Sequence, residues 1–154
     1  MRHPVIGTLL VIAIGFTGCG GDGNDDGRLS REAYLTKADT ICKEANQRET
    51  ESGVPAGGQE IDDPRVQRSM VAGLRATLAD LRELEVPEGD EAKVAEIISS
   101  LEGVLKARRG QFRAARAGDG PAQTEAESAF VRASQDLGGS AGSYGLTHCQ
   151  ALGF

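Results

Sequence analysis

The chain of 154 residues has no tryptophan, only four phenylalanines and two tyrosines, and only two histidines. Proteins that bind nucleic acid usually combine a basic surface with stacking rings. This chain has few rings and a formal net charge of −6, so we expect no nucleic-acid partner. His3 and His148 lie at opposite ends of the chain, and the three cysteines are far apart. No cluster has the usual spacing of metal ligands or of a base beside a nucleophile. We therefore expect a protein that is not an enzyme and that carries no cofactor.

The first 19 residues have the layout of an export signal. Arg2 precedes an apolar stretch over residues 5–16, and small residues follow. This stretch is too short to span a bilayer and resembles the apolar region of a signal peptide. Cys19 directly follows Thr17 and Gly18. The arrangement resembles the bacterial lipobox, in which a diacylglycerol is joined to the cysteine sulfur and cleavage leaves that cysteine as the first residue. Phe16 departs from the pattern, which prefers Leu, Val or Ile at that position.

This resemblance predicts both location and organisation. Residues 1–18 would be a lipoprotein signal peptide, and Cys19 would be acylated and held in membrane lipid at the outer face of the cell membrane. Two or more acyl chains hold a protein stably. Residues 19–29 are rich in Gly and Asp and are predicted to form a disordered tether, followed by a folded domain over residues 30–154. Two alternatives stay open: a secretory signal cut nearby, which leaves Cys19 as a free thiol, and an uncleaved anchor.

The folded domain is predicted to be all-α. Apolar residues recur at helical spacing and no alternating strand pattern competes. Caps and breakers predict four helices, over residues 30–51, 63–86, 90–118 and 121 onward, the first three after the N-caps Ser30, Asp63 and Asp90. Helices joined by short turns favour a four-helix up-down bundle.

The fourth helix has the weakest pattern. It contains few large apolar residues, and Gly138, Gly139 and Gly142 predict a loose or broken helix toward its end. Gly145 is predicted to adopt the left-handed conformation that terminates a helix, with Leu146 packing back over the last turn.

The cysteine count predicts one disulfide. If Cys19 carries lipid, Cys42 and Cys149 remain as a pair, and an oxidising compartment permits them to join. Cys42 lies on the apolar stripe of the first predicted helix, where a bridge partner could meet it. The alternative is that the two are unrelated thiols and that Cys42 only fills core.

Two short motifs carry a further resemblance. Residues 38–42 (ADTIC) are followed by Asn46, and the chain closes with residues 144–149 (YGLTHC). With the lipobox, these are similar to small exported lipoproteins of high-GC Gram-positive bacteria, in which an ADxIC…N helix and a GLxxC tail recur. The resemblance implies a helical, disulfide-closed exported domain and no particular activity.

The third predicted helix carries a basic stripe at i, i+3, i+7 and i+10, formed by Lys106, Arg109, Arg113 and Arg116, with Arg108 close by. One interpretation is an anion-binding stripe for lipid head groups, wall polymer or an acidic partner. The other, which we favour, is a solvated face paired with acids on neighbouring helices.

Taken together, these features predict a membrane-anchored, extracytoplasmic, non-enzymatic helical module that interacts with an envelope protein or wall polymer. The alternative is a lipoprotein that holds a small apolar or anionic molecule between its helices. Met70 and Phe112 could line such a cavity, although the many alanines predict close packing and little empty volume.

Overall fold

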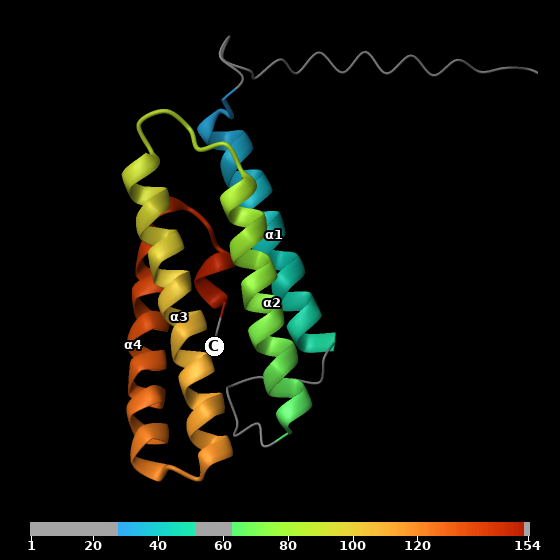
Figure 1. Cartoon of the computed structure of the whole chain (residues 1–154). Helices are drawn as coiled ribbons and strands as arrows, with labels where there is room; N and C mark the ends of the chain where they lie inside the picture. Colours follow the sequence, from blue (N-terminus) through green and yellow to red (C-terminus); the bar gives the residue numbers. More distant parts are fainter. Residues whose placement is uncertain (1–27, 52–62, 153–154) are drawn as a thin grey trace, which may run out of the picture.

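A computed structural model describes residues 28–51 and 63–152 of the protein. The predicted signal peptide, Cys19 and most of the predicted tether lie outside these residues. The described chain forms an all-α bundle of four antiparallel helices, as predicted (Figure 1). These are α1 (Arg31–Glu51), α2 (Pro64–Glu83), α3 (Glu91–Ala117) and α4 (Gly120–Tyr144), and a short 3₁₀ helix, η1 (Cys149–Ala151), follows them.

Side-chain caps fix where the helices begin. The Ser30 hydroxyl accepts a hydrogen bond from the Ala33 N–H at 3.2 Å, and the Asp63 carboxylate accepts from the Arg65 N–H at 2.7 Å. At the start of α4, the Asp119 carboxylate accepts a hydrogen bond from the Ala122 N–H at 3.0 Å. Each cap satisfies an amide that has no partner inside its helix. The predicted starts of α1 and α2 are thus confirmed.

Asp90 is a partial exception. It occupies the N-cap position of α3 but makes no side-chain cap, contrary to expectation. Its carboxylate instead accepts a hydrogen bond from the buried Tyr144 hydroxyl at 2.9 Å, and it lies 3.7 Å from the charged groups of Arg31 and Lys93. The side chain therefore joins the end of α4 to the start of α3. Burial and this hydrogen bond raise the pKa of Tyr144.

The prediction of a loose or broken end to the fourth helix is wrong. Helix α4 is continuous to Tyr144 despite its glycines. Leu137 and Ala141 are fully buried in this stretch, and packing of this kind outweighs weak intrinsic propensity. A Cβ at Gly142 would lie 2.7 Å from the Oε1 of the exposed Gln150 side chain, which would have to move slightly to make room for it.

The predicted end of α4 is confirmed. Gly145 adopts a left-handed φ of +105°, and the Leu146 N–H donates to the Ala141 carbonyl at 2.9 Å. This is a Schellman turn, which favours glycine because other residues resist positive φ. The chain then reverses, and Leu146 is buried against the core.

Helices α3 and α4 form the most intimate pair of the bundle. Added Cβ atoms at Gly103 and Gly110 would lie 3.3 Å from the Cβ atoms of Ala133 and Ala126. Both pairs are seven residues apart on each helix, so small residues repeat along one seam and let the backbones approach closely. The predicted close packing of alanines holds for this seam.

The C-terminal segment completes the core on the other side. Among the described residues, the α1 backbone comes within 8 Å (Cα–Cα) of α2 and η1 but not of α3 or α4. Leu146, Cys149 and Leu152 are each about 1% exposed. Figure 1 shows η1 between the α1–α2 and α3–α4 pairs. The segment after Tyr144 therefore acts as a wedge between two helical pairs.

Candidate functional site

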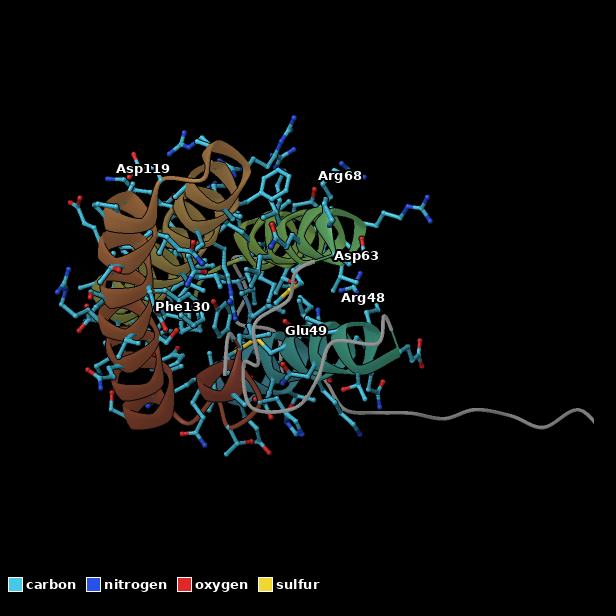
Figure 2. All side chains as sticks on the ribbon, turned by 90° about the horizontal axis from the view of Figure 1, so that it is seen from below. Arg48, Glu49, Asp63, Arg68, Asp119 and Phe130 are labelled. Atoms are coloured by element: carbon cyan, nitrogen blue, oxygen red, sulfur yellow. A yellow bond between two sulfur atoms is a disulfide. The ribbon has the colours of Figure 1, made fainter. Side chains whose placement is uncertain are left out.

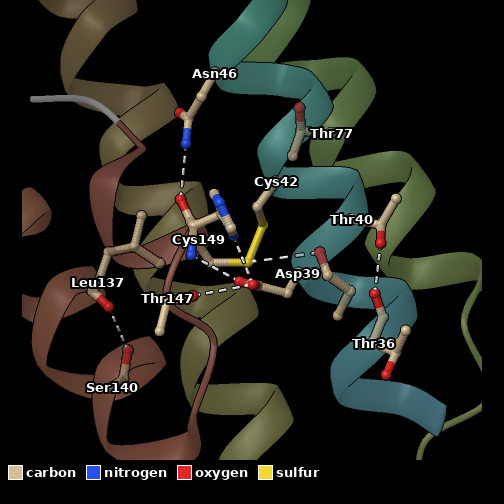
Figure 3. The surroundings of a disulfide bond; sticks show 12 residues. Thr36, Asp39, Thr40, Cys42, Asn46, Thr77, Leu137, Ser140, Thr147 and Cys149 are labelled. Atoms are coloured by element: carbon tan, nitrogen blue, oxygen red, sulfur yellow. Dashed lines mark hydrogen bonds and ion pairs between the residues drawn. A yellow bond between two sulfur atoms is a disulfide. The ribbon is translucent and has the colours of Figure 1, made fainter.

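The predicted disulfide is confirmed. Cys42 of α1 and Cys149 of η1 are joined, with Cα atoms 4.9 Å apart and 107 positions apart in sequence (Figure 3). Both residues are buried. The bridge therefore fixes the C-terminal wedge to α1, whose backbone does not come within 8 Å (Cα–Cα) of α3 or α4 in the described part of the chain.

Polar contacts surround the bridge on both sides. Asp39 accepts hydrogen bonds from the Thr147 hydroxyl at 3.0 Å and from the His148 N–H at 2.7 Å, and its Oδ2 lies 2.6 Å from the His148 Nδ1. The Asn46 amide donates to the His148 carbonyl at 2.9 Å. We call these residues, with Cys42 and Cys149, the tail clasp. Burial raises the pKa of Asp39, but the hydrogen bonds from His148 and Thr147 outweigh it, so the pKa of Asp39 is lowered.

The tail clasp explains residues to which sequence reasoning gave no role. Asp39, Cys42 and Asn46 lie at i, i+3 and i+7, so they share one face of α1. The ADTIC motif with its following Asn is thus one continuous contact surface for the THC segment. The signal that could have found it was this helical spacing from Cys42. His148 is half-exposed and belongs to this contact.

The predicted basic stripe lies on the outer side of α3. Lys106, Arg113 and Arg116 are exposed and Arg109 is half-buried. Among residues 28–51 and 63–152, no carboxylate lies within ion-pair distance of any of the four. The acidic partners that the solvated-face interpretation expects are not found in this part of the chain. Arg116 instead lies 5.7 Å from the centre of the Phe112 ring.

Arg108 does not belong to the stripe, because it turns into the bundle. Its guanidinium lies 3.7 Å from the centre of the Phe130 ring of α4 and donates a hydrogen bond to the Gln111 Oε1 at 3.3 Å. Burial lowers the pKa of Arg108, and the charge of Glu49 opposes this shift. Burial likewise raises the pKa of Glu49, against the charge of Arg108. Figure 2 shows Glu49 and Phe130 pointing toward the middle of the bundle.

The neighbouring helix extends the basic surface, which sequence reasoning missed. Residues 64–79 of α2 contain three arginines and no acid, and residues 103–117 of α3 contain five basic residues and no acid. The two segments lie antiparallel at the same end of the bundle (Figure 1). We define the basic face as the exposed or half-buried cations of both segments: Arg65, Arg68, Arg75, Lys106, Arg109, Arg113 and Arg116.

A single ion pair fixes the register of this face. Arg82 of α2 pairs with Glu102 of α3. Because the helices are antiparallel, the same register places Arg75, seven residues before Arg82, at the level of Arg109, seven residues after Glu102. A further step of seven residues places Arg68 at the level of Arg116. Figure 2 shows Arg68 projecting away from α1. The spacing of Arg68, Arg75 and Arg82 was the available signal, but it has meaning only once α2 and α3 are known to be neighbours.

An open cavity of about 470 Å³ lies between α1 and α2. Its apolar lining includes Met70, Leu74 and Leu152, and Glu49 lies among its charged residues. Met70 thus lines this cavity, as considered from the sequence, and Phe112 is not among its lining residues. The volume exceeds what the alanine content led us to expect, and small residues of α2, Ala72, Gly73 and Ala76, form part of the lining.

Comparisons with known proteins gave no match: neither a family model, nor a curated protein, nor a solved structure is similar to this chain. In the described parts of the chain, no helix is long and apolar enough to cross a membrane. Among the same residues, no three His, Cys, Asp or Glu side chains are grouped so as to hold a metal ion.

Proposed function

We propose that this chain is an exported lipoprotein, anchored by acylated Cys19 at the outer face of the cell membrane, whose helical domain is a non-enzymatic interaction module of the envelope. The observation that carries the proposal is the buried disulfide. Structural disulfides form and persist in oxidising compartments outside the cytosol. A bridge that joins the C-terminal wedge to α1 therefore supports export.

The leader and the cysteine count support the same proposal. Residues 1–18 have the layout of a signal peptide, and Cys19 follows two small residues as in a lipobox. Because Cys42 and Cys149 are joined to each other, Cys19 is the one cysteine left over. The likeness to small lipoproteins of high-GC Gram-positive bacteria adds the same expectation from the ADTIC and GLTHC motifs.

The test is a Cys19→Ser substitution in a bacterial host that acylates lipoproteins. We expect the unchanged chain to incorporate labelled fatty acid and to sediment with membranes that have been washed at high salt, and Cys19→Ser to lose both properties. A matched control replaces Cys42 and Cys149 together, which should leave labelling intact. A Cys19→Ser chain that still sediments with membranes after a high-salt wash would contradict lipid anchoring, and so would reduced chain accumulating in the cytosol.

A second candidate function, binding of a small apolar molecule, is favoured by the cavity between α1 and α2. Its volume lies within the range of small-molecule sites, which are mostly apolar with a few polar groups. Native mass spectrometry of chain purified from its host would show a retained ligand mass. Gly73 lines the cavity with open space at its Cβ position, so Gly73→Leu should remove that mass. Identical empty masses for both chains would count against this function.

A further inference from the structure

On α2 and α3, though not on α1 and α4, acidic and basic residues are segregated along the long axis of the bundle. The turn between α2 and α3 and the residues around it carry Glu83, Glu85, Glu88, Asp90 and Glu91. The described chain also begins at this end, at Arg28 beside the start of α3, where Arg28 pairs with Glu91 at 3.4 Å. We call it the proximal end, because the proposed anchor precedes it in sequence. The basic face occupies the opposite, distal half of α2 and α3 (Figure 1).

The cations of the basic face contribute little to charge pairing within the fold, although Arg116 lies near the Phe112 ring. Among the described residues none of the seven takes part in an ion pair, and six of them are exposed. Basic residues stabilise α3 through the helix dipole only near its last turn. Lys106 and Arg109 lie well before that turn. Seven like charges on two neighbouring helices repel one another in the free protein, so an anionic partner would relieve this repulsion.

We propose that the basic face lies against the anionic head groups of the membrane that holds the lipid anchor, an inference that rests on the proposed anchoring at Cys19. The face consists of two parallel rows of cations on adjacent helices, so its charge is spread over a plane. Each segment has about 15 residues, which gives the face a length of roughly 22 Å. A planar charge array of this size suits a membrane surface, where each nearby Lys or Arg adds to binding.

The chain length before the domain permits this contact. Arg28 lies nine positions after Cys19, so the two residues can be at most about 30 Å apart. Helix α3 is roughly 40 Å long, so an upright domain would hold the basic face beyond the Debye length of about 8–10 Å. A domain lying on its side needs only its own radius of about 10 Å between Arg28 and the lipid. The reach is sufficient, and anchoring raises the effective concentration of the face near the lipid.

The contact is electrostatic and does not involve insertion into the bilayer. Among the described residues the one large hydrophobic side chain that is strongly exposed is Val131 of α4, which is not part of the basic face. An interfacial helix would instead bury an apolar face below the head groups. Binding should therefore weaken steeply as ionic strength rises.

The test uses the full mature chain with Cys19→Ser, so that no acyl chain contributes. Its partitioning onto vesicles of phosphatidylglycerol and phosphatidylcholine is compared with that onto phosphatidylcholine alone, at low and high salt. The variant Arg68→Gln/Arg75→Gln/Arg113→Gln removes three exposed cations of the face. The matched control, Lys37→Gln/Lys43→Gln/Arg132→Gln, makes the same change in net charge at exposed positions on α1 and α4. Circular dichroism melting verifies that both variants stay folded.

We expect binding to the anionic vesicles only, lost at high salt. Each cation in contact with the surface raises the affinity for the vesicle by roughly fivefold, so the face variant should bind on the order of 100-fold more weakly than the parent. The control should bind nearly as well as the parent. Equal binding of the face variant and the parent would overturn the proposal. So would binding to lipid-free cell-wall sacculi without binding to anionic vesicles, which would assign the face to wall polymer. Neither outcome depends on acylation, so a failure here is distinct from a failure of the anchoring test.

Discussion

Removing the Cys42–Cys149 bridge should destabilise the domain without dismantling it. In the chain-entropy model, a cross-link that closes about 100 residues stabilises a protein by up to about 4.7 kcal/mol, and this bridge spans 107 positions. For a domain of this size each kcal/mol corresponds to roughly 2–4 °C in Tm. We therefore expect the double substitution Cys42→Ala/Cys149→Ala to lower Tm by roughly 10–20 °C.

The native fold should survive the change because the bridge is not the tail's only attachment. Asp39 and Asn46 still bind the segment around His148, and Leu146 and Leu152 remain buried. The effect should lie mainly in the unfolded state, which becomes less restricted. Urea unfolding followed by far-UV circular dichroism should therefore show a lower midpoint and a larger m-value, since more surface is exposed on unfolding.

The assay is best performed in a Cys19→Ser background, where no third thiol can exchange. Reduced parent chain and the double variant should unfold at similar temperatures, because both lack the cross-link. If oxidised and reduced chains melt within about 3 °C of each other, the wedge is not held in the way described. Loss of helix signal at 25 °C on reduction would also refute the reasoning, because it would mean that the remaining contacts cannot hold the fold.

Four further substitutions, at three places in the structure, are tested by thermal or urea unfolding. Gly139→Ala should stabilise by about 0.5–1 kcal/mol, because Gly139 is helical with open space at its Cβ, whereas Gly145→Ala should destabilise by about 1–2 kcal/mol because of its left-handed φ; the opposite order would contradict the described end of α4. Because the pKa of Asp39 is lowered in the folded chain, the stabilisation that its carboxylate provides is fully present above the unfolded pKa of about 3.9. This stabilisation is lost as pH falls through the folded pKa. Asp39→Ala should therefore destabilise by about 1–2 kcal/mol at pH 7 and flatten the dependence of stability on pH below pH 4. Tyr144→Phe should destabilise by about 1–3 kcal/mol, because the buried Asp90 carboxylate loses a donor, and an unchanged urea midpoint would exclude a role for this hydrogen bond.

Local signals were sufficient for most of the helices. Ser30 and Asp63 cap helices at the predicted residues, and Gly145 ends α4 as expected, because caps and left-handed turns depend on a few neighbouring residues. The continuity of α4 was not accessible in this way. Glycines such as Gly142 weaken an isolated helix, and the burial of Leu137 and Ala141 that outweighs them depends on packing against distant segments.

Features that depend on pairing between distant segments were predicted least well. Cys42 and Cys149 were paired by counting, but the hydrogen bonds from Thr147 and His148 to Asp39 required the tail to be placed on α1. The basic residues of α3 were recognised as a stripe because helical spacing is visible in one segment. The three arginines of α2 join them only through antiparallel packing, which no single-segment pattern encodes.

The wedge has a consequence for the order of events during biogenesis. A polypeptide that leaves a translocation channel amino end first presents α1 long before residues 146–152, yet these last residues complete its hydrophobic environment. On this route the chain cannot complete its fold until nearly all of it has left the channel, and the Cys42–Cys149 disulfide can form only after that. If the chain is exported as proposed, late closure of this kind would keep the precursor unfolded while it passes through a narrow pore and would delay compaction until translocation is complete.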